Sequence, residues 1–364
     1  MKTDNNVEWK VSEKKTKKKI PLAVKIVLAF AGVFLLLAIA AFAFLQSKLD
    51  KINKVDSSSV DVVPREEETF ETDDSLDLTG DVVSPEEISW DDVDVNVMRD
   101  EDVINILLIG QDRREGQGRQ RSDTMIICSL NKKTKKIILS SVMRDLYVPI
   151  PGYSDNRINA SYQFGGMPLL DQVIEESLGI HIDGNIEVDF EGFVEALSCV
   201  GNLDIELNEA EANYLNSNNK WIAQAGTDST GWNLHAGVNS LTPEQALAYS
   251  RIRYVGNSDW ERTDRQRRVV MAAFNKVKDK SLAELLDLAD EILPSLTTDM
   301  TNMEILGLVY TIFTNGMTEM ESYRIPVEGT YTCETLSVGM EVLVPNLNEN
   351  SKYLQGYIYG ESEQ

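Results

Sequence analysis

Arginines and acidic side chains gather in two stretches of this chain that lie far apart in the sequence, at residues 110–145 and 251–266. Guanidinium groups match phosphate oxygens through pairs of parallel hydrogen bonds. Because an unpaired buried charge is costly, a group of arginines in one cleft would imply an anionic ligand that neutralises them. The alternative is that these side chains are scattered over the surface. The candidate anion-binding residues are Arg121, Arg144, Arg251, Arg253, Arg262 and Arg265.

Two aspartates in the first stretch point to a metal ion as well. Asp112 and Asp123 lie at the ends of neighbouring predicted strands, and one or two carboxylates with phosphate oxygens and waters are the usual ligands of Mg²⁺. The alternative is that each carboxylate simply pairs with a nearby arginine. Asn159 and Tyr162 also leave two interpretations open, because their side chains could hydrogen-bond a sugar or cap a helix.

Several other classes of site are poorly supported. The chain has no G-x-S-x-G elbow, no G-x-x-x-x-G-K-[ST] loop and no H-E-x-x-H helix, and the isolated His181 and His235 are interpreted as structural. The formal net charge of −24 argues against general nucleic-acid binding, which needs a basic footprint. The three cysteines allow at most one disulfide and have no metal-site spacing.

Hydrophobic patterns predict the elements that must position the charged residues. Residues 104–109 form an aliphatic run that Gly110 ends, and 124–130 and 136–142 are β-rich runs joined by a polar turn, which predicts a buried strand followed by a hairpin. Helices are predicted from Pro168 to a cap at Gly179, and over 191–200. Alternating strands and helices indicate an α/β domain with helices on both faces of a sheet.

The second arginine stretch is predicted to begin where a helix ends. A capping box that starts at Thr242 opens this helix, which should fray near Arg251. Arg251 and Arg253 point the same way only if the backbone between them is extended. A further helix is predicted beyond Asp259. One face of it carries the i, i+3, i+4 and i+7 positions Arg262, Arg265, Gln266 and Val269. Arg267 and Arg268 lie on other faces of this helix and are predicted to be solvated.

The N-terminal region predicts a membrane anchor. Residues 1–25 form a basic tail, and the run over 26–47 is almost purely apolar from Ile26 to Leu45, long enough for a helix that crosses a bilayer. A cleaved signal peptide is the main alternative, although its apolar region is usually shorter. The lysines of the tail are expected to stay in the cytoplasm, which would place the rest of the chain outside the cell membrane.

The remainder of the chain divides by composition. Residues 48–102 are rich in Asp, Glu, Ser, Thr and Pro, which predicts an acidic flexible linker because such a segment buries too little apolar surface to offset its ordering entropy. Residues 103–364 are long enough for one sizeable domain with a full core. This domain contains both arginine stretches.

Seven short blocks in this domain resemble the LytR-CpsA-Psr family, extracellular phosphotransferases of mainly Gram-positive bacteria. The blocks occur in order over much of the domain, which makes the resemblance far more specific than a single motif. They are 105–112 (NILLIGQD), 121–124 (RSDT), 144–145 (RD), 158–162 (INASY), 188–193 (VDFEGF), 246–253 (ALAYSRIR) and 262–266 (RTDRQ).

The resemblance implies an α-β-α sandwich with a central mixed sheet, preceded by one transmembrane helix. It also implies an enzyme that moves an anionic glycopolymer, such as a wall teichoic acid or capsular polysaccharide, from a polyprenyl pyrophosphate carrier to peptidoglycan. Two alternatives stay open: a non-catalytic scaffold or sensor that binds polyprenyl phosphate lipids, and a hydrolase that acts on the same pyrophosphate. Residues alone do not distinguish water from a sugar hydroxyl as the acceptor.

The resemblance also assigns roles to residues. The metal-associated aspartates of the family correspond to Asp112 and Asp123, which implies that these two bind Mg²⁺. The general base is not identified, but Asp112 is the first candidate and Asp145 the second. Glu261 departs from the family pattern, since a glycine often stands there, and Met143 replaces a proline. The catalytic residues implied are Asp112, Arg121, Arg144, Arg253 and Arg262. The substrate-binding residues implied are Arg114, Arg251, Arg265, Gln266, Asn159, Phe190 and Phe193.

Overall fold

The computed structural model describes residues 43–360 apart from 74, 77, 112, 114, 115, 218–227, 257 and 258. Within that part of the chain, no helix is both long and apolar enough to cross a membrane. The basic tail and most of the predicted anchor over 26–47 lie outside the described residues. Residues up to Lys48 form a unit separate from the one that starts at Leu49, and the fold described below is that of the second unit.

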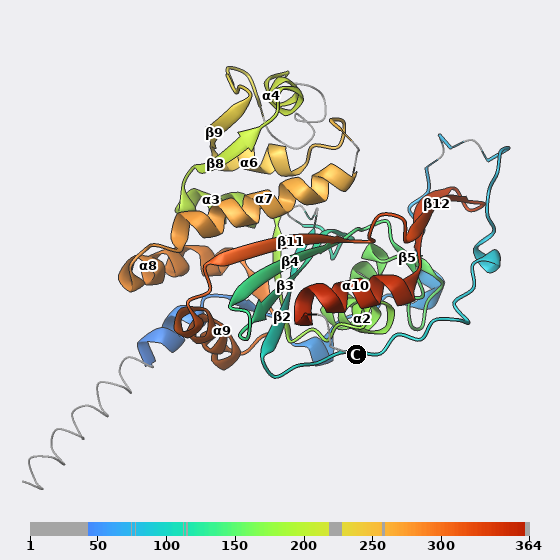
Figure 1. Ribbon diagram of the computed structural model, residues 1–364, viewed down its shortest axis with the longest axis horizontal. Coiled ribbons are helices and arrows are strands. Elements are labelled where there is room, and N and C mark those ends of the chain that lie inside the picture. Colours follow the sequence, from blue (N-terminus) through green and yellow to red (C-terminus); the bar gives the residue numbers. More distant parts are fainter. Residues whose placement is uncertain are drawn as a thin grey trace, which may run out of the picture. The chain divides into compact units, whose positions relative to one another are not determined.

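A mixed sheet forms the centre of the domain (Figure 1). The predicted aliphatic strand is β2 (Val103–Gln111), and the predicted hairpin is β3 (Ser122–Asn131) and β4 (Lys136–Val142). Strand β3 pairs antiparallel with both β2 and β4, whereas β7 (Gly184–Asp189) pairs with β2 and β11 (Glu319–Ile325) pairs with β4 in parallel. In the described residues the order is β1-β10-β7-β2-β3-β4-β11, with β1 (Asn53–Lys54) and β10 (Thr297–Thr298) at one edge.

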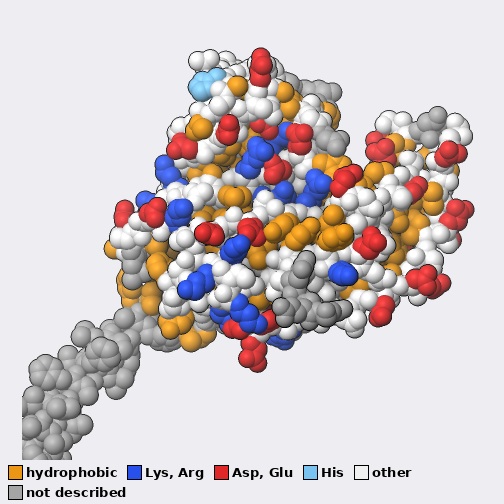
Figure 2. Space-filling model, viewed as in Figure 1, with side chains coloured by type: hydrophobic (Ala, Val, Ile, Leu, Met, Phe, Trp, Pro, Cys, Tyr) orange, Lys and Arg blue, Asp and Glu red, His pale blue; other side chains and the backbone are white. Residues whose placement is uncertain are grey.

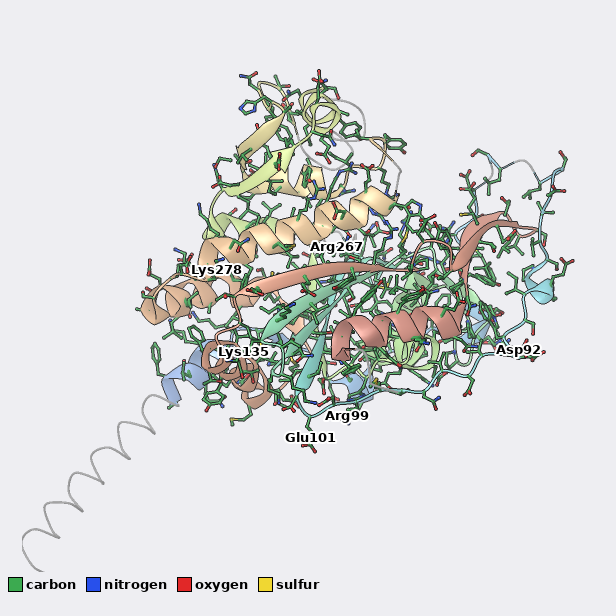
Figure 3. All side chains as sticks on the ribbon, viewed as in Figure 1. Asp92, Arg99, Glu101, Lys135, Arg267 and Lys278 are labelled. Carbon is green, nitrogen blue, oxygen red and sulfur yellow. The ribbon has the colours of Figure 1, made fainter. Side chains whose placement is uncertain are left out.

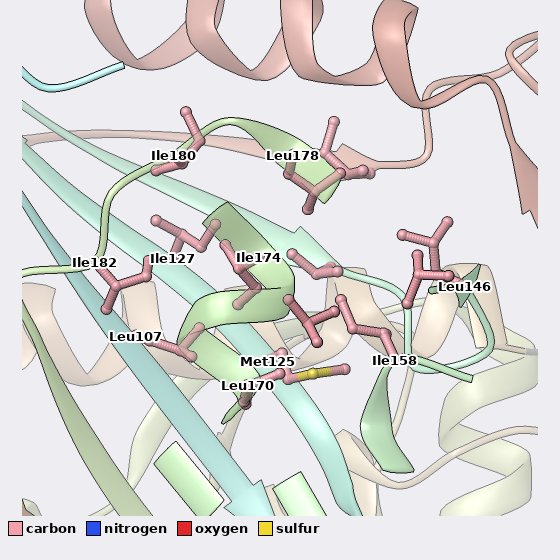
Figure 4. Packing of buried hydrophobic residues seen from close by; sticks show 14 of the residues in the cluster. Leu107, Met125, Ile127, Leu146, Ile158, Leu170, Ile174, Leu178, Ile180 and Ile182 are labelled. Atoms are coloured by element: carbon pink, nitrogen blue, oxygen red, sulfur yellow. The ribbon is translucent and has the colours of Figure 1, made fainter. Parts of the chain in front are cut away.

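Helices cover both faces of this sheet, which confirms the predicted sandwich with a central mixed sheet. On one face, Leu107 and Ile127 pack against α2 (Asn159–Leu178) and α10 (Leu347–Tyr359), as Figure 4 shows for α2. On the other face, Ile126 and Leu139 pack against α7 (Asp259–Val277) and α9 (Asn302–Asn315). Alternate residues of β3 thus point into different cores, as the two-residue period of a strand requires.

A smaller group of elements extends the second face. It comprises α3 (Phe190–Val200), β8 (Leu203–Leu207), α4 (Glu209–Asn216), β9 (Gly237–Leu241) and α6 (Pro243–Ser250), which share an apolar cluster with α7. Helix α8 (Leu282–Ile292) and the short η4 (Leu293–Ser295) follow α7 in the chain. Two small two-stranded sheets complete the fold: β5 (Tyr147–Val148) with β6 (Asn156–Arg157), and β12 (Tyr331–Leu336) with β13 (Met340–Pro345).

The predicted helix signals are confirmed, with one extension. Thr242 accepts a hydrogen bond from the Gln245 N–H in a complete capping box at the start of α6. Gly179 ends α2 with a left-handed φ of 70°, as a C-terminal glycine cap requires. Helix α2 begins before Pro168, at Asn159, because a first helical segment precedes a kink at Gly166, where φ is 66° and ψ is −154°.

The segment predicted as a flexible linker lies along the domain. Besides the short 3₁₀ turns η1 (Ser57–Ser59), η2 (Arg65–Glu67) and η3 (Pro85–Glu87), the Val63 N–H donates to a carbonyl of α2 at 2.8 Å, and Val83 bridges to β12. The folded unit therefore extends to Leu49, beyond the boundary predicted at residue 103. The physical reason is that sparse apolar residues, hidden in an average composition, attach this segment to the core: Val63, Val83, Ile88, Trp90, Val93 and Val95.

Candidate active site

A cavity of about 990 Å³ lies between the sheet and the helices α3, α6 and α7. One part of its wall is apolar, with side chains from β2, β3, β7 and the three helices. Another part is strongly charged and brings the two arginine stretches of the sequence together, which excludes their being scattered over the surface. The predicted site residues in the wall are Arg121, Asp123, Arg144, Phe190, Phe193, Arg251, Arg253, Arg262 and Gln266.

Asp123 is the centre of the charged part. It follows the first residue of β3, and its carboxylate accepts a hydrogen bond from Arg144 Nη1 at 2.7 Å and one from Arg253 Nη2 at 3.3 Å. Burial alone would raise the pKa of Asp123, but the nearby Arg144, Arg262 and Arg253 outweigh it and lower the pKa to about 2. Asp123 is therefore a carboxylate at every physiological pH, and it ties both arginine stretches to one point.

Arg262 has buried hydrogen-bond donors that no described residue satisfies. Its side chain is only 3% exposed, and its Nη1 lies 2.9 Å from Asp259 Oδ1, an ion-pair distance without the alignment of a hydrogen bond. Among the described residues, Nε and Nη1 of Arg262 and Nε of Arg144 are buried donors that meet no acceptor. Burial and the like charges of Arg144 and Arg253 lower the pKa of Arg262 to about 10. An anion in the cavity would relieve both costs.

Two further carboxylates hold the arginines in place. Asp259, the first residue of α7, lies 3.6 Å from both Arg144 Nη2 and Arg253 Nε. Asp145 lies 3.6 Å from Arg144 Nε and 3.4 Å from Arg157 Nε. Burial and the neighbouring Asp259 raise the pKa of Asp145 despite these arginines, whereas the surrounding arginines lower that of Asp259. The two acids thus differ in proton affinity, and neither is part of the cavity wall.

Arg121 lies at the edge of the cavity and is held by backbone as well as side chain. Its Nη2 donates to the Thr69 carbonyl at 2.6 Å and its Nη1 to Asn159 Oδ1 at 3.4 Å. Glu71, also in the wall, accepts a hydrogen bond from Arg157 at 3.0 Å. The segment predicted as a linker therefore supplies part of the site, and Asn159 supports Arg121 from behind rather than lining the cavity itself.

The apolar part of the cavity starts at α3. Phe190 and Phe193 both line it, and the Arg251 guanidinium lies over the Phe190 ring, 4.0 Å from its centroid, a contact that favours a cation over the face of an aromatic ring. Beyond these, the wall consists of aliphatic side chains such as Leu108, Ile186 and Val269. A ligand that fills this cavity would have an anionic group at one end and a long apolar group at the other.

Arg265 does not belong to the cavity wall, which corrects its assignment as a substrate-binding residue. It is 1% exposed, and it donates to Glu211 at 2.8 Å, to Glu261 at 2.6 Å and to the carbonyls of Ile252 and Val255 at 3.0 Å. The i, i+3 spacing put Arg265 on the face of Arg262, but the loop after α6 covers Arg265 and accepts its hydrogen bonds. Its role is to fix that loop, which carries Arg251 and Arg253.

The solvation predicted for the two neighbouring arginines was right for one of them. The Arg268 side chain is 50% exposed and pairs with Asp264 at 2.7 Å. Arg267 is buried, between α7 and β11 in Figure 3, where the pKa of Arg267 is lowered by burial to about 10 despite the nearby Asp264. Helix α7 packs against neighbours on more than one side. Less of its surface therefore faces solvent than is expected for a helix with a single apolar face.

The predicted magnesium site is described in part. Asp112 and Arg114 lie outside the described residues, and in the part that is described no group of three or more His, Cys, Asp or Glu side chains could hold a metal ion. Asp123 offers carboxylate oxygens at the cavity, the donor class that Mg²⁺ prefers. Mg²⁺ is often held by one or two carboxylates together with substrate phosphates. Asp123 could therefore be one ligand of such a site, and the other ligands would come from the substrate and from residues outside the described part.

Comparison with known proteins decides the family. The model described as the LytR_cpsA_psr family matches residues 69–355. The chain belongs to the LytR-CpsA-Psr family. The match begins at Thr69, inside the segment that contacts Arg121, so the LytR-CpsA-Psr domain includes residues that composition assigned to a linker.

Individual relatives agree with this assignment. The polyisoprenyl-teichoic acid–peptidoglycan teichoic acid transferase TagU of Oceanobacillus iheyensis is 35% identical over 235 residues, which cover 61% of this chain and 68% of that protein. A structure of TagT bound to LIIa-WTA is 26% identical, with a TM-score of 0.57 over 71% of this chain and 92% of that one. TagT with bound octaprenyl pyrophosphate lipid has the same fold, at 23% identity and a TM-score of 0.52 over 71% of this chain and 91% of that one.

Sequence reasoning missed three contributors to the site of this LytR-CpsA-Psr protein. Asp259 had a detectable signal, since it precedes Arg262 by three residues at a helix start, the spacing of a helical ion pair. Arg157 directly precedes the 158–162 block and was not assigned a role. Glu71 gave no signal, because it belongs to an acidic segment and reaches the site only through long-range packing.

Proposed function

We propose that this protein is a phosphotransferase that moves an anionic glycopolymer from a polyprenyl pyrophosphate carrier to peptidoglycan. The observation that carries the proposal is the cavity itself: buried arginine donors without acceptors among the described residues lie at one part of the wall, and much of the remaining wall is apolar. A lipid pyrophosphate has this same division into a charged head and an apolar chain. The names of TagU and of the ligand-bound TagT structures support the same substrate class.

The proposed reaction transfers one phosphoryl group. A peptidoglycan hydroxyl oxygen attacks the phosphorus that carries the sugar, a new P–O bond forms, and the bond from that phosphorus to the bridging oxygen breaks. The leaving group is polyprenyl phosphate, and the hydroxyl proton passes to a base. Such transfers depend mainly on positioning and charge stabilisation, which Arg144, Arg253 and Arg262 would supply. Arg121 and Arg251 would hold the outer phosphate oxygens.

Asp112 is our proposed base. Asp123 touches the cavity, but with a pKa of about 2 it binds a proton too weakly for this task. Asp145, the second candidate from the sequence, is not part of the cavity wall. In our proposal Asp145 is a positioning residue, since it lies within ion-pair distance of Arg144 and Arg157.

We further propose that Mg²⁺ binds to Asp112 and Asp123 together with the substrate phosphates. When bound, the ion would neutralise charge that develops on the transferred group. We also keep the proposal of a membrane protein with a cytoplasmic N-terminus and an extracellular catalytic domain, which rests on the sequence of residues 1–47. Protease accessibility of the domain on intact cells tests this orientation.

The test of the function is turnover of a synthetic polyprenyl-pyrophosphate oligosaccharide by the full-length protein in detergent, with Mg²⁺, with and without peptidoglycan oligomers. The expected products are oligosaccharide joined to peptidoglycan and free polyprenyl phosphate. Release of lipid phosphate without an acceptor, in equal amount with or without peptidoglycan, would identify a hydrolase instead. Tight binding without any product, unchanged in Asp123→Ala, would identify a binding scaffold or sensor.

A further inference from the structure

Helix α9 is apolar on two sides, and only one of them faces the core. Leu308 and Ile312 pack against the cluster of β3 and β4. On the other side, Val309, Tyr310 and Phe313 are 43%, 70% and 54% exposed, and α9 contains no fully buried residue among those described. A helix that is hydrophobic all round is normally buried in a protein or in lipid.

The outward residues form one continuous patch. Their spacings of three and four residues place Val309, Tyr310 and Phe313 side by side on the helix surface, and the half-buried Leu306 extends the patch by one turn. Apolar side chains lie over α9 at the lower left of the space-filling view in Figure 2. Contiguous exposed apolar surface of this kind marks an interaction site.

The start of α9 is also where the chain enters the domain. Asn302, the first residue of α9, donates a hydrogen bond to Asp50 at 2.7 Å, and Lys54 donates to the Met300 carbonyl at 2.6 Å. The apolar run of the anchor predicted over 26–47 ends at Leu45, five residues before Asp50. Five residues span at most about 18 Å even when fully extended. If the apolar run lies in a bilayer, the start of α9 must lie close to the bilayer surface.

We propose that the outward face of α9, formed by Leu306, Val309, Tyr310 and Phe313, inserts into the outer surface of the membrane. At about 21 Å in length, α9 can lie along the interface with an apolar face among the lipid headgroups, as amphipathic surface helices do. Tyr310 suits this position, because its ring is apolar and its hydroxyl is polar. This contact would fix the orientation of the domain relative to a lipid-linked substrate.

The proposal rests on the membrane location given under Proposed function, and its test does not depend on catalysis. The full-length protein is placed in vesicles of phosphatidylethanolamine and phosphatidylglycerol, in a Cys199→Ser/Cys333→Ser background. Cys128 is half-buried in the core cluster of β3 and β4, and desolvation raises its pKa to about 12, so it resists labelling. A polarity-sensitive fluorophore is attached at Phe313→Cys. The matched control is Val238→Cys, which is 64% exposed on β9, at the opposite end of the domain in Figure 1.

Insertion predicts a blue-shifted emission at position 313 that lipid-borne spin labels near the headgroups quench, and a solvent-like, unquenched emission at position 238. Equal solvent exposure at both positions would overturn the proposal, as would failure of the full chain to float with the vesicles. A signal at 313 that rises with protein density but is insensitive to spin-labelled lipid would assign the face to a second copy of the chain, which also overturns it.

A functional readout separates this proposal from the previous one. Tyr310→Ser/Phe313→Ser is expected to slow transfer from a long-chain substrate in vesicles, but not from a short-chain, water-soluble analogue in detergent-free solution. Val238→Ser is expected to slow neither. If lipid quenches the fluorophore at position 313 but the protein shows no turnover, the proposed enzymatic function is refuted and the proposed membrane contact is supported.

Discussion

Two arginines three residues apart on α7 are equally buried and have opposite environments. Arg265 makes hydrogen bonds to two carboxylates and two backbone carbonyls. Arg262 lines the cavity, lies among like charges that contribute to a lowered pKa, and has two buried donors that no described residue satisfies. Arg265 thus finds its partners within the described chain, whereas Arg262 has donors that an anion in the cavity would satisfy.

For these two arginines, the unsatisfied donors together with a place in the cavity wall distinguish a functional from a structural role, whereas residue type and burial do not. A satisfied buried charge is destabilising to remove, because its partner is left alone. An unsatisfied buried charge destabilises the protein until its ligand binds, as is common in sites that trade stability for activity. The four predictions below test whether stability and activity divide between the two regions in this way.

Arg265→Ala should have the largest effect, and on stability. The substitution leaves Glu211, itself 2% exposed, without the guanidinium that pairs with it at 2.8 Å. Breaking a buried pair costs about 3–5 kcal/mol, which chemical denaturation would measure as a loss in the free energy of unfolding. Arg262→Ala is the matched control and should lose little stability, because Asp259 keeps its ion pairs with Arg144 and Arg253. Equal losses in the two variants would contradict the comparison.

Arg144→Ala should have the largest effect on transfer. Arg144 joins Asp123, Asp145 and Asp259 and carries one of the buried donors without an acceptor in the described chain. By analogy with removal of one donor to a developing oxyanion, turnover should fall by about 10²-fold or more. Arg268→Ala, on the exposed face of α7, should leave turnover unchanged. Full activity in purified, folded Arg144→Ala would remove this arginine from the mechanism.

Phe193→Ala should have a smaller effect, confined to the apolar part of the cavity. Truncation removes ring surface from the wall and should weaken binding of a long polyprenyl substrate about tenfold, the cost of part of one buried aromatic side chain. A short-chain analogue that does not reach this part should bind as before. Competition binding with both substrates measures the ratio, and a uniform loss for both would show that Phe193 acts through the fold and not through the lipid.

Sequence patterns predicted the strands and helices around the site better than the contacts of its individual side chains. The aliphatic run of β2, the hairpin of β3 and β4, and the capping box of α6 are local patterns, so their elements follow directly from residue types. The wrong assignment of Arg265 and the missed role of Glu71 have one cause. Both depend on which distant segment covers a side chain, and neither helix periodicity nor composition contains that information.

Asp171 extends the comparison to a place where no ligand is proposed. One of its carboxyl oxygens accepts a hydrogen bond from Asn185 Nδ2 at 2.8 Å, and the other is buried and meets no partner in the described residues. Burial, with a contribution from the nearby Asp299, raises the pKa of Asp171 to about 8 although the Asn185 hydrogen bond lowers it. A bound proton would lower the cost of burying this group, because a neutral carboxyl loses far less solvation free energy than a carboxylate when water is removed.

The sign of the resulting pH dependence is fixed. An unfolded aspartate has a pKa of about 3.9, so the folded chain holds an extra proton between that value and about 8. The stability that this proton contributes is fully present below the unfolded pKa and is lost as the pH rises toward the folded pKa. Asp171→Asn should therefore be more stable than the wild type near pH 8, and this difference in unfolding free energy should shrink by about 1.4 kcal/mol for each pH unit down to about pH 4. Denaturation curves at several pH values measure this slope, and identical slopes in both proteins would mean that the unpaired oxygen of Asp171 does not reflect a bound proton.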